Sequence, residues 1–185
     1  RKTYQGFVVA GTHSSAGKSS VSMGLMRLLK DSGWSIKPFK VGPDYIDPGF
    51  HTAASGRPCL NIDSWAMRAD TTASLFGQVA AHSEIVLGEG VMGLFDGAHA
   101  PPGQKSGSTA DTAAELGLPV ILVVDAAAQA QSAAAVVHGF ATFRDDVTVA
   151  GVIFNRVGSA RHADMLERAA APLGIPILGC VPRSA

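Results

Sequence analysis

Charged residues and cysteines are scarce in this sequence. Asp, Glu, Lys and Arg make up 16% of its 185 residues, their formal net charge is zero, and no stretch forms a basic stripe. Because nucleic-acid binding depends on clustered positive charge, the composition argues against nucleic acid as a partner. The two cysteines, Cys59 and Cys180, form no Cys-x-x-Cys pair, and this favours a reducing cytoplasm.

Several functional signatures are also missing. Asp125 and Gln129 interrupt the longest apolar runs, which are too short to span a bilayer, and no signal peptide is recognisable. We therefore predict a cytoplasmic protein without membrane association. The histidines lack the spacing of a metal site, and no Gly-x-Ser-x-Gly elbow occurs. Hydrophobic residues make up 46% of the chain, which is the composition of a globular domain with a sizeable core.

One stretch, Gly11 to Ser19, has the composition of a phosphate-binding loop. It follows an apolar strand and precedes a helical segment, so its backbone N–H groups and the helix N-terminus would surround an anion. Lys18 would reach the terminal phosphates, and the Ser19 hydroxyl would ligate Mg²⁺. Thr12 replaces the first glycine of the common pattern, and Gly11 lies one position earlier. The alternative is a glycine- and serine-rich turn that carries a solvated lysine.

Strands alternate with helices along the rest of the chain, which predicts an α/β fold of the P-loop NTPase kind. Its sheet would be doubly wound and mostly parallel, with helices on both faces. Long loops over Val41–Asp63 and Gly88–Ser108 follow strands, so they should meet the phosphate loop at one edge of the sheet. The predicted strands are Tyr4–Ala10, Trp34–Lys40, one beginning at Ile85–Leu87, Pro119–Val124, Val147–Phe154 and Ile175–Cys180. The predicted helices are Lys18–Asp31, Asp70–Ala81, Asp111–Leu116 with Ser108 or Thr109 as its cap, Ala126–Phe143 and Arg161–Ala171.

Charged and polar side chains follow several of these strands. Lys40 and Asp44 follow the second strand, where a cation can hold phosphate and an acid can bind Mg²⁺. Glu89 directly follows a buried strand, the usual position of a second acidic contact to Mg²⁺. Asp96 is a weaker candidate, and Asn155 could read a purine edge. Each has a plainer alternative: a solvated loop charge for Asp44, a turn-forming acid for Asp96, and a helix cap for Asn155.

A second glycine pattern, Gly88-x-Gly90-x-x-Gly93, matches the dinucleotide-binding fingerprint. That fingerprint needs a helix directly after it, and the segment Leu94 to Gly103, with its two consecutive prolines, cannot open one. Glu89 would also repel a pyrophosphate. The sequence therefore argues against nicotinamide or flavin binding.

The phosphate loop resembles that of dethiobiotin synthetase, and longer segments resemble the cobyrinic acid a,c-diamide synthase family. These segments are Lys40 to His51, Asn61 to Trp65, Glu89 to Gly97, Asn155 to Val157 and Leu178 to Arg183. The resemblance implies an ATP-dependent amide ligase of cobalamin biosynthesis. Members of that family amidate the a- and c-carboxylates of cobyrinate or hydrogenobyrinate, with glutamine as nitrogen donor. A close relative acts on a nickel sirohydrochlorin, and the residues do not distinguish the two.

The resemblance also implies roles for individual residues. Lys18, Lys40, Asp44 and Glu89 would be catalytic, with both lysines on the transferring phosphate. The Mg²⁺ contacts would be Ser19, Asp44 and Glu89. The corrinoid would meet Tyr45, Ile46 and Asp96, and ATP would meet Thr12, Ser15, Ala16, Gly17, Lys18, Ser19, Ser20 and, at the adenine, Asn155.

The family also carries a C-terminal glutaminase domain that this chain does not match. Residues 1–185 therefore resemble the ATP-binding synthetase domain alone, and the start at Arg1 and end at Ala185 suggest a fragment of a longer protein. With this chain alone, free ammonia would have to serve as the nitrogen donor in place of glutamine. In the full-length protein, a covalently linked glutaminase domain would release ammonia from glutamine. A homodimer is plausible by resemblance. Two other functions stay open: a P-loop regulatory ATPase, such as a metal-insertion switch, and a non-catalytic corrinoid carrier.

Overall fold

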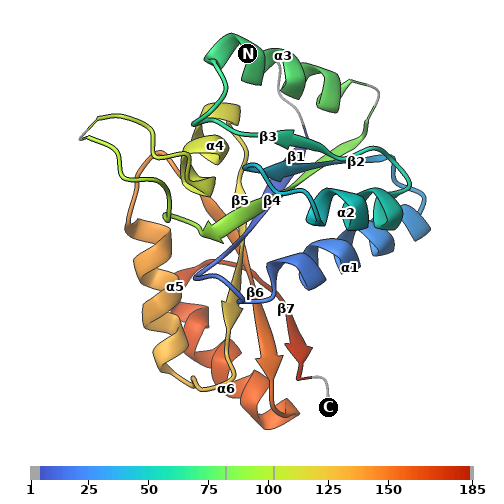
Figure 1. Cartoon of the computed structure of the whole chain (residues 1–185). Helices are drawn as coiled ribbons and strands as arrows, with labels where there is room; N and C mark the ends of the chain where they lie inside the picture. Colours follow the sequence, from blue (N-terminus) through green and yellow to red (C-terminus); the bar gives the residue numbers. More distant parts are fainter. Residues whose placement is uncertain (1–4, 82, 102, 184–185) are drawn as a thin grey trace.

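The fold is built on one seven-stranded sheet in which every pair of neighbouring strands is parallel (Figure 1). The computed structural model describes residues 5–81, 83–101 and 103–183. The strand order is β3-β2-β4-β1-β5-β6-β7. The strands are β1 Gly6–Gly11, β2 Ile36–Val41, β3 Leu60–Ile62, β4 Ile85–Gly93, β5 Val120–Asp125, β6 Val149–Val157 and β7 Ile177–Pro182.

Helices cover both faces of this sheet. They are α1 Lys18–Asp31, α2 Asp47–Ser55, α3 Ala69–Ala80, α4 Thr109–Leu116, α5 Ser132–Thr142 and α6 Ala160–Ala170, followed by a short 3₁₀ turn at Ala171–Leu173. Alternate residues of β1 point to opposite faces, as a strand requires. Val9 packs in the core under α1 and α2, whereas Val8 and Ala10 pack in the larger core under α3 to α6. The predicted doubly wound sheet with helices on both faces is therefore confirmed.

Most predicted elements lie close to their observed bounds. Helix α1 has the predicted limits, and Ser108 caps α4 by accepting a hydrogen bond from the Asp111 backbone N–H. Tyr4, the predicted first residue of β1, lies outside the described residues. The predicted helix Ala126–Phe143 begins only at Ser132, because residues 126–131 form turns, one of them held by the Asp125 carboxylate on the backbone N–H of Ala127.

Two predicted loops contain regular structure instead. The segment Val41–Asp63 holds α2 and β3, both too short to give a clear periodicity. Pro48 lies in the first turn of α2, and Gly56 ends the helix in a left-handed conformation with φ 73°. The segment Gly88–Ser108 begins with residues 88–93 of β4. A side chain at Gly88 would clash with the Phe39 ring, and one at Gly90 would clash with Thr109. Glycine is needed at these positions because neighbouring side chains pack closely against the strand, and its presence does not indicate a loop.

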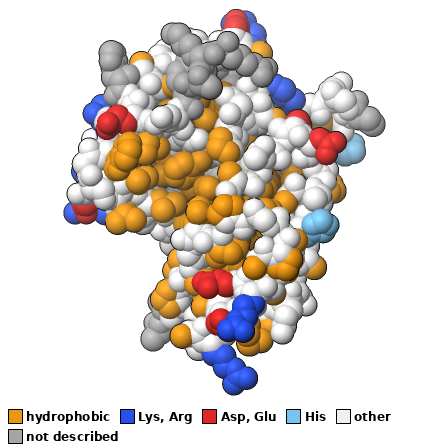
Figure 2. All heavy atoms as spheres, turned by 180° about the vertical axis from the view of Figure 1, so that it is seen from behind, with side chains coloured by type: hydrophobic (Ala, Val, Ile, Leu, Met, Phe, Trp, Pro, Cys, Tyr) orange, Lys and Arg blue, Asp and Glu red, His pale blue; other side chains and the backbone are white. Residues whose placement is uncertain are grey.

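Hydrophobic side chains also reach the surface. Figure 2 shows them gathered across the middle of one face, with most charged side chains toward its margins. No described helix is long and apolar enough to cross a membrane.

Candidate functional site at the carboxyl edge of the sheet

The phosphate loop joins β1, the central strand, to the first turn of α1. Gly17 closes the loop with φ 98°, and a Cβ there would lie 2.0 Å from Nδ2 of Asn155. Only glycine fits both this left-handed conformation and this close approach. The Nδ2 group of Asn155 donates a hydrogen bond to the Ala16 carbonyl at 2.9 Å. The end of β6 thus fixes the loop in place.

A second contact from β6 supports the same loop. Arg156 pairs with Asp125 at the end of β5 and donates a hydrogen bond to the Ser15 carbonyl at 3.0 Å. The loop is therefore tied to the ends of two strands that lie more than 100 positions later in the chain. Such ties hold the backbone N–H groups where an anion would meet them.

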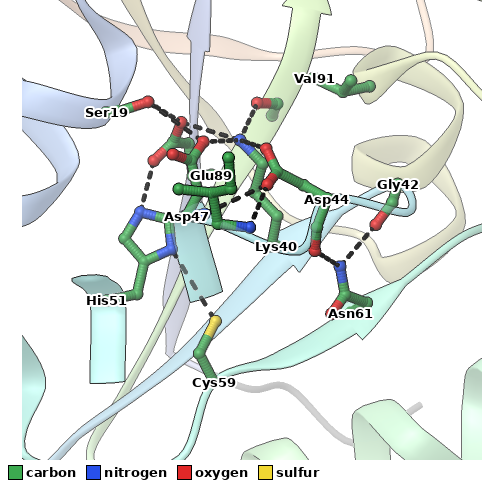
Figure 3. A network of polar contacts seen from close by, with 12 residues as sticks. Ser19, Lys40, Gly42, Asp44, Asp47, His51, Cys59, Asn61, Glu89 and Val91 are labelled. Atoms are coloured by element: carbon green, nitrogen blue, oxygen red, sulfur yellow. Dashed lines mark hydrogen bonds and ion pairs between the residues drawn. The ribbon is translucent and has the colours of Figure 1, made fainter. Parts of the chain in front are cut away.

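Lys40 lies at the centre of a charged network formed by β2, β4 and α2 (Figure 3). It pairs with Glu89 across the adjacent strands, with 2.9 Å between Nζ and Oε1. Its Nζ also lies 2.7 Å from Oδ2 of Asp47 and 3.2 Å from the Gly90 carbonyl. Lys40 is 3% exposed, and a buried cation needs such partners. Burial alone would lower the pKa of Lys40, but Glu89 and Asp47 outweigh it and the pKa is raised.

Ser19, in the first turn of α1, joins this network to the phosphate loop. Its hydroxyl donates to Oε1 of Glu89 at 2.7 Å and lies 3.2 Å from Oδ2 of Asp47. The neighbouring Lys18 is also buried, and burial lowers its pKa against the attraction of Glu89. The predicted residues Lys18, Ser19, Lys40 and Glu89 therefore lie together at one edge of the sheet.

Glu89 is fully buried, and its two carboxylate oxygens have different partners. Oε1 accepts hydrogen bonds from Ser19 and Lys40, and Oε2 lies 2.5 Å from Nε2 of His51. Burial opposes ionisation of this carboxyl group. The hydrogen bonds from His51 and Ser19 and the charge of Lys40 outweigh that cost and lower the pKa of Glu89 to about 2.

Both Asp44 and Asp47 lie near Lys40, whereas the sequence predicted only Asp44 at this site. Oδ1 of Asp44 accepts hydrogen bonds from the backbone N–H groups of Ile46 and Asp47, at 2.8 and 3.1 Å, and so fixes the start of α2. Its Oδ2 lies 3.7 Å from Nζ of Lys40. Asp47 makes the shorter contact to Lys40 and also approaches Ser19. The available signal for Asp47 was an acid followed by proline, which is typical of a helix start.

The predicted substrate residues lie on the rim of this edge. Tyr45 is 94% exposed and Ile46 is 71% exposed, so both present apolar surface to any ligand. Asp96 follows β4, where its carboxylate accepts a hydrogen bond from the Gly93 backbone N–H at 3.0 Å. This contact holds the turn after β4, and the charge of Asp96 also acts on Lys18.

The oxygen donors at this edge fit a magnesium ion that arrives with a nucleotide. Among the described residues, no group of three or more His, Cys, Asp and Glu side chains could hold a metal by itself. Mg²⁺ usually takes one or two carboxylates and completes its octahedron with water and substrate phosphate. Ser19, Asp47 and Glu89 supply one hydroxyl and two carboxylates beside the phosphate loop.

The loop, the buried lysines and the buried carboxylate of Glu89 in β4 define a P-loop nucleotide-binding protein. The chain belongs to the family described as the CobQ/CobB/MinD/ParA nucleotide binding domain, whose model matches residues 7–185. This assignment confirms the predicted P-loop fold class.

Curated relatives support the more specific resemblance. The chain is 51% identical to the hydrogenobyrinate a,c-diamide synthases of Brucella ovis and Rhizobium meliloti, over 97% of its own length. It is 48% identical to the enzyme of that name from Mycobacterium tuberculosis, over 96% of its length. The matched regions are 40%, 41% and 39% of those proteins. The resemblance to a,c-diamide synthases is thus confirmed, and the chain spans about two fifths of the relatives' length.

Solved structures support the fold alone. The signal recognition particle receptor FtsY from Elizabethkingia anophelis matches with a TM-score of 0.63 at 15% identity, over 96% of this chain and 58% of that one. The FtsY protein of Thermotoga maritima matches with a TM-score of 0.60 at 18% identity, over 99% of this chain and 63% of that one.

Proposed function

We propose that this chain is the ATP-binding synthetase domain of an a,c-diamide synthase that acts on hydrogenobyrinate or cobyrinate. The observation that carries the proposal is the network in which Lys40, Ser19 and Glu89 meet beside the phosphate loop. About half of the residues are identical to those of proteins named for this activity. In the longer protein, a linked glutaminase domain would supply nitrogen from glutamine.

The proposed reaction has two steps. A carboxylate of the corrinoid attacks the γ-phosphorus of ATP, and the bond from that phosphorus to the bridging oxygen breaks to release ADP. Ammonia then attacks the acyl carbon, phosphate leaves, and the nitrogen loses a proton to give the amide. Activation is needed because a free carboxylate is a poor electrophile. Phosphoryl transfer depends mainly on positioning and charge neutralisation, and Mg²⁺, when bound, would supply part of the positive charge.

The described residues have matching roles in this scheme. The loop from Thr12 to Ser20 would hold the phosphates, and Lys18 and Lys40 would face the transferring group. Ser19 and Glu89 would hold the metal, together with Asp47 or Asp44. The exposed rim at Tyr45 and Ile46 would receive the macrocycle, and Asp96, just after β4, would also contact it.

A groove beside α1 supports the predicted place of the adenine. Its volume is about 360 Å³, and its lining is mainly apolar. Asn155 lines the groove, and its Nδ2 group donates to the Ala16 carbonyl of the adjoining phosphate loop. The other lining residues come from α1, β6 and β7: Ser20, Val21, Gly24, Leu25, Ile153, Leu178, Gly179, Cys180 and Val181.

The Lys18→Ala variant tests the proposal. With ATP, Mg²⁺, ammonium and hydrogenobyrinate, the chain should release ADP and add up to two amides, measured by mass spectrometry of the corrinoid. Lys18→Ala should abolish both, because the transferring phosphoryl group loses a charge that stabilises it. The matched control is Lys30→Ala, which removes an exposed lysine near the far end of the same helix.

Unchanged turnover in Lys18→Ala would contradict the assigned role. The products separate the competing functions. ADP release without a change in corrinoid mass would indicate a regulatory ATPase, and corrinoid binding without ADP release would indicate a carrier. Parallel reactions with cobyrinate and nickel sirohydrochlorin identify the preferred substrate.

A further inference from the structure

His51 is the one histidine that the fold buries completely among the described residues, and it lies against the site. It occupies the middle of α2, one helical turn after Asp47. Residues four positions apart share a helix face, so α2 directs both side chains toward Lys40 and Glu89. Figure 3 shows the His51 ring below the Glu89 carboxylate, with Cys59 on its other side.

The partners of the ring determine which nitrogen carries hydrogen. Nε2 lies 2.5 Å from Oε2 of Glu89. An ionised carboxylate can only accept hydrogen bonds, so Nε2 is the donor. Nδ1 lies 3.8 Å from Sγ of Cys59. Burial, together with the charge of Glu89, raises the pKa of the Cys59 thiol to about 12, so Cys59 keeps its proton and can donate it to Nδ1.

We propose that His51 is a positioning residue for Glu89. By holding Oε2, it turns the other oxygen, Oε1, toward Ser19 and Lys40, where the metal and the transferring phosphate would lie. Without this contact the carboxylate could rotate about its last bond, and Oε1 would no longer have a fixed direction. The inference rests on the proposed function, because it concerns the metal that accompanies ATP.

Three substitutions of His51, together with Cys59→Ala, separate positioning from packing. His51→Leu removes the donor and keeps an apolar side chain. His51→Gln places an amide N–H near the position of Nε2, so it should restore the contact with Glu89. His51→Asn is also polar, but its amide lies near the position of Nδ1, which faces Cys59. Cys59→Ala removes the other partner of the ring and leaves the Glu89 contact intact.

The readout is Mn²⁺ binding in the presence of a non-hydrolysable ATP analogue, measured by electron paramagnetic resonance. Loss of an outer partner of a metal ligand typically weakens metal binding by about 10- to 100-fold, and we expect this loss in His51→Leu and His51→Asn. His51→Gln and Cys59→Ala should bind close to wild type. The Mg²⁺ concentration that half-saturates turnover should rise in the same two variants, with less change in KM for ATP. Circular dichroism and thermal unfolding establish that each variant is folded.

Two results would overturn the inference: wild-type Mn²⁺ affinity in a folded His51→Asn or His51→Leu, or an equal loss in His51→Gln and His51→Leu. The second would show that the imidazole ring matters for packing and not as a donor to Glu89. Failure of the wild-type chain to bind Mn²⁺ with nucleotide would instead contradict the proposed function, and the inference with it.

Discussion

Lys40 shows how single residues set the chemistry of this site. Its buried ammonium group lies between Asp47 and Glu89, and a buried charge is tolerated only when partners compensate for lost water. The same carboxylates would otherwise repel each other and an incoming nucleotide. Lys40 therefore holds the acids in place before any ligand arrives.

Asp47 and Asp44 can be separated by matched substitutions. We expect Asp47→Asn to lower ATP turnover by roughly 10- to 100-fold, the usual cost of disturbing the groups around a bound metal. The change keeps the shape of the side chain and removes the charge that faces Lys40 and Ser19. Asp44→Asn should have a smaller effect, because an asparagine oxygen can still accept the hydrogen bonds that start α2.

Steady-state ATP hydrolysis at several Mg²⁺ concentrations provides the measurement for both variants. An equal or larger loss in Asp44→Asn would return to Asp44 the metal contact that the sequence predicted.

At the scale of elements, the contact between the phosphate loop and β6 fixes the conformation of the loop. The loop and the strand end meet where Gly17 and Asn155 leave no room for another atom. A strand that lies far along the chain thus determines the conformation of a loop whose motif is local. Loops held in this way keep their geometry in the absence of ligand.

A double-mutant cycle tests this contact. Gly17→Ala should weaken nucleotide binding, because a left-handed conformation costs a non-glycine residue about 1–2 kcal/mol and the new methyl group meets Asn155. Asn155→Ala should also weaken binding through the lost hydrogen bond to Ala16. The double variant should lose less than the sum of the two, with a coupling of about 0.5–3 kcal/mol. Nucleotide affinity of the four proteins, measured by calorimetry, gives this coupling, and strict additivity would contradict the contact.

At the scale of the whole molecule, one buried and one partly buried carboxylate link stability to pH. Hydrogen bonds and charge lower the pKa of Glu89 to about 2 despite its burial. Asp111, at the start of α4, is also partly desolvated, but Arg144 and Ser106 lower its pKa to about 2. Arg144 lies just after α5, with 2.7 Å between its Nη1 and Oδ1 of Asp111. This pair therefore joins α4 to the segment that follows α5.

Both carboxyl groups have a lower pKa in the folded chain than in the unfolded one. Their contribution to stability is fully present above the unfolded values, 4.5 for Glu89 and 3.8 for Asp111, and is lost as pH falls toward 2. The free energy of unfolding should therefore drop between about pH 5 and pH 2. Asp111→Asn should remove roughly 2 kcal/mol of that dependence.

Urea unfolding at a series of pH values measures this effect. Arg168→Gln is a suitable control, because Arg168 pairs with Asp164 on the exposed surface of α6, where ion pairs contribute little. A flat stability profile for the wild type, or the same slope in Asp111→Asn, would contradict the prediction.

Features that depend on neighbours in the chain could be predicted from the sequence. The phosphate loop with its flanking strand and helix is one continuous segment, and the bounds of α1 were predicted to the residue. Glu89 was found because it directly follows an apolar run, although the strand does not end there and β4 continues to Gly93. The alternation of strands and helices was sufficient for the class of fold, since hydrophobic periodicity is a local property.

Only the tertiary structure decided which strands are neighbours in the sheet, and which side chains therefore meet at the site. The order of the strands places β2 beside β4, and this neighbourhood brings Lys40 opposite Glu89. A short helix, hidden in what looked like a loop, adds Asp47 and His51, and β6 closes the loop from 139 positions away. Such pairings follow from the packing of the whole sheet, and neighbouring residues in the chain carry no signal for them.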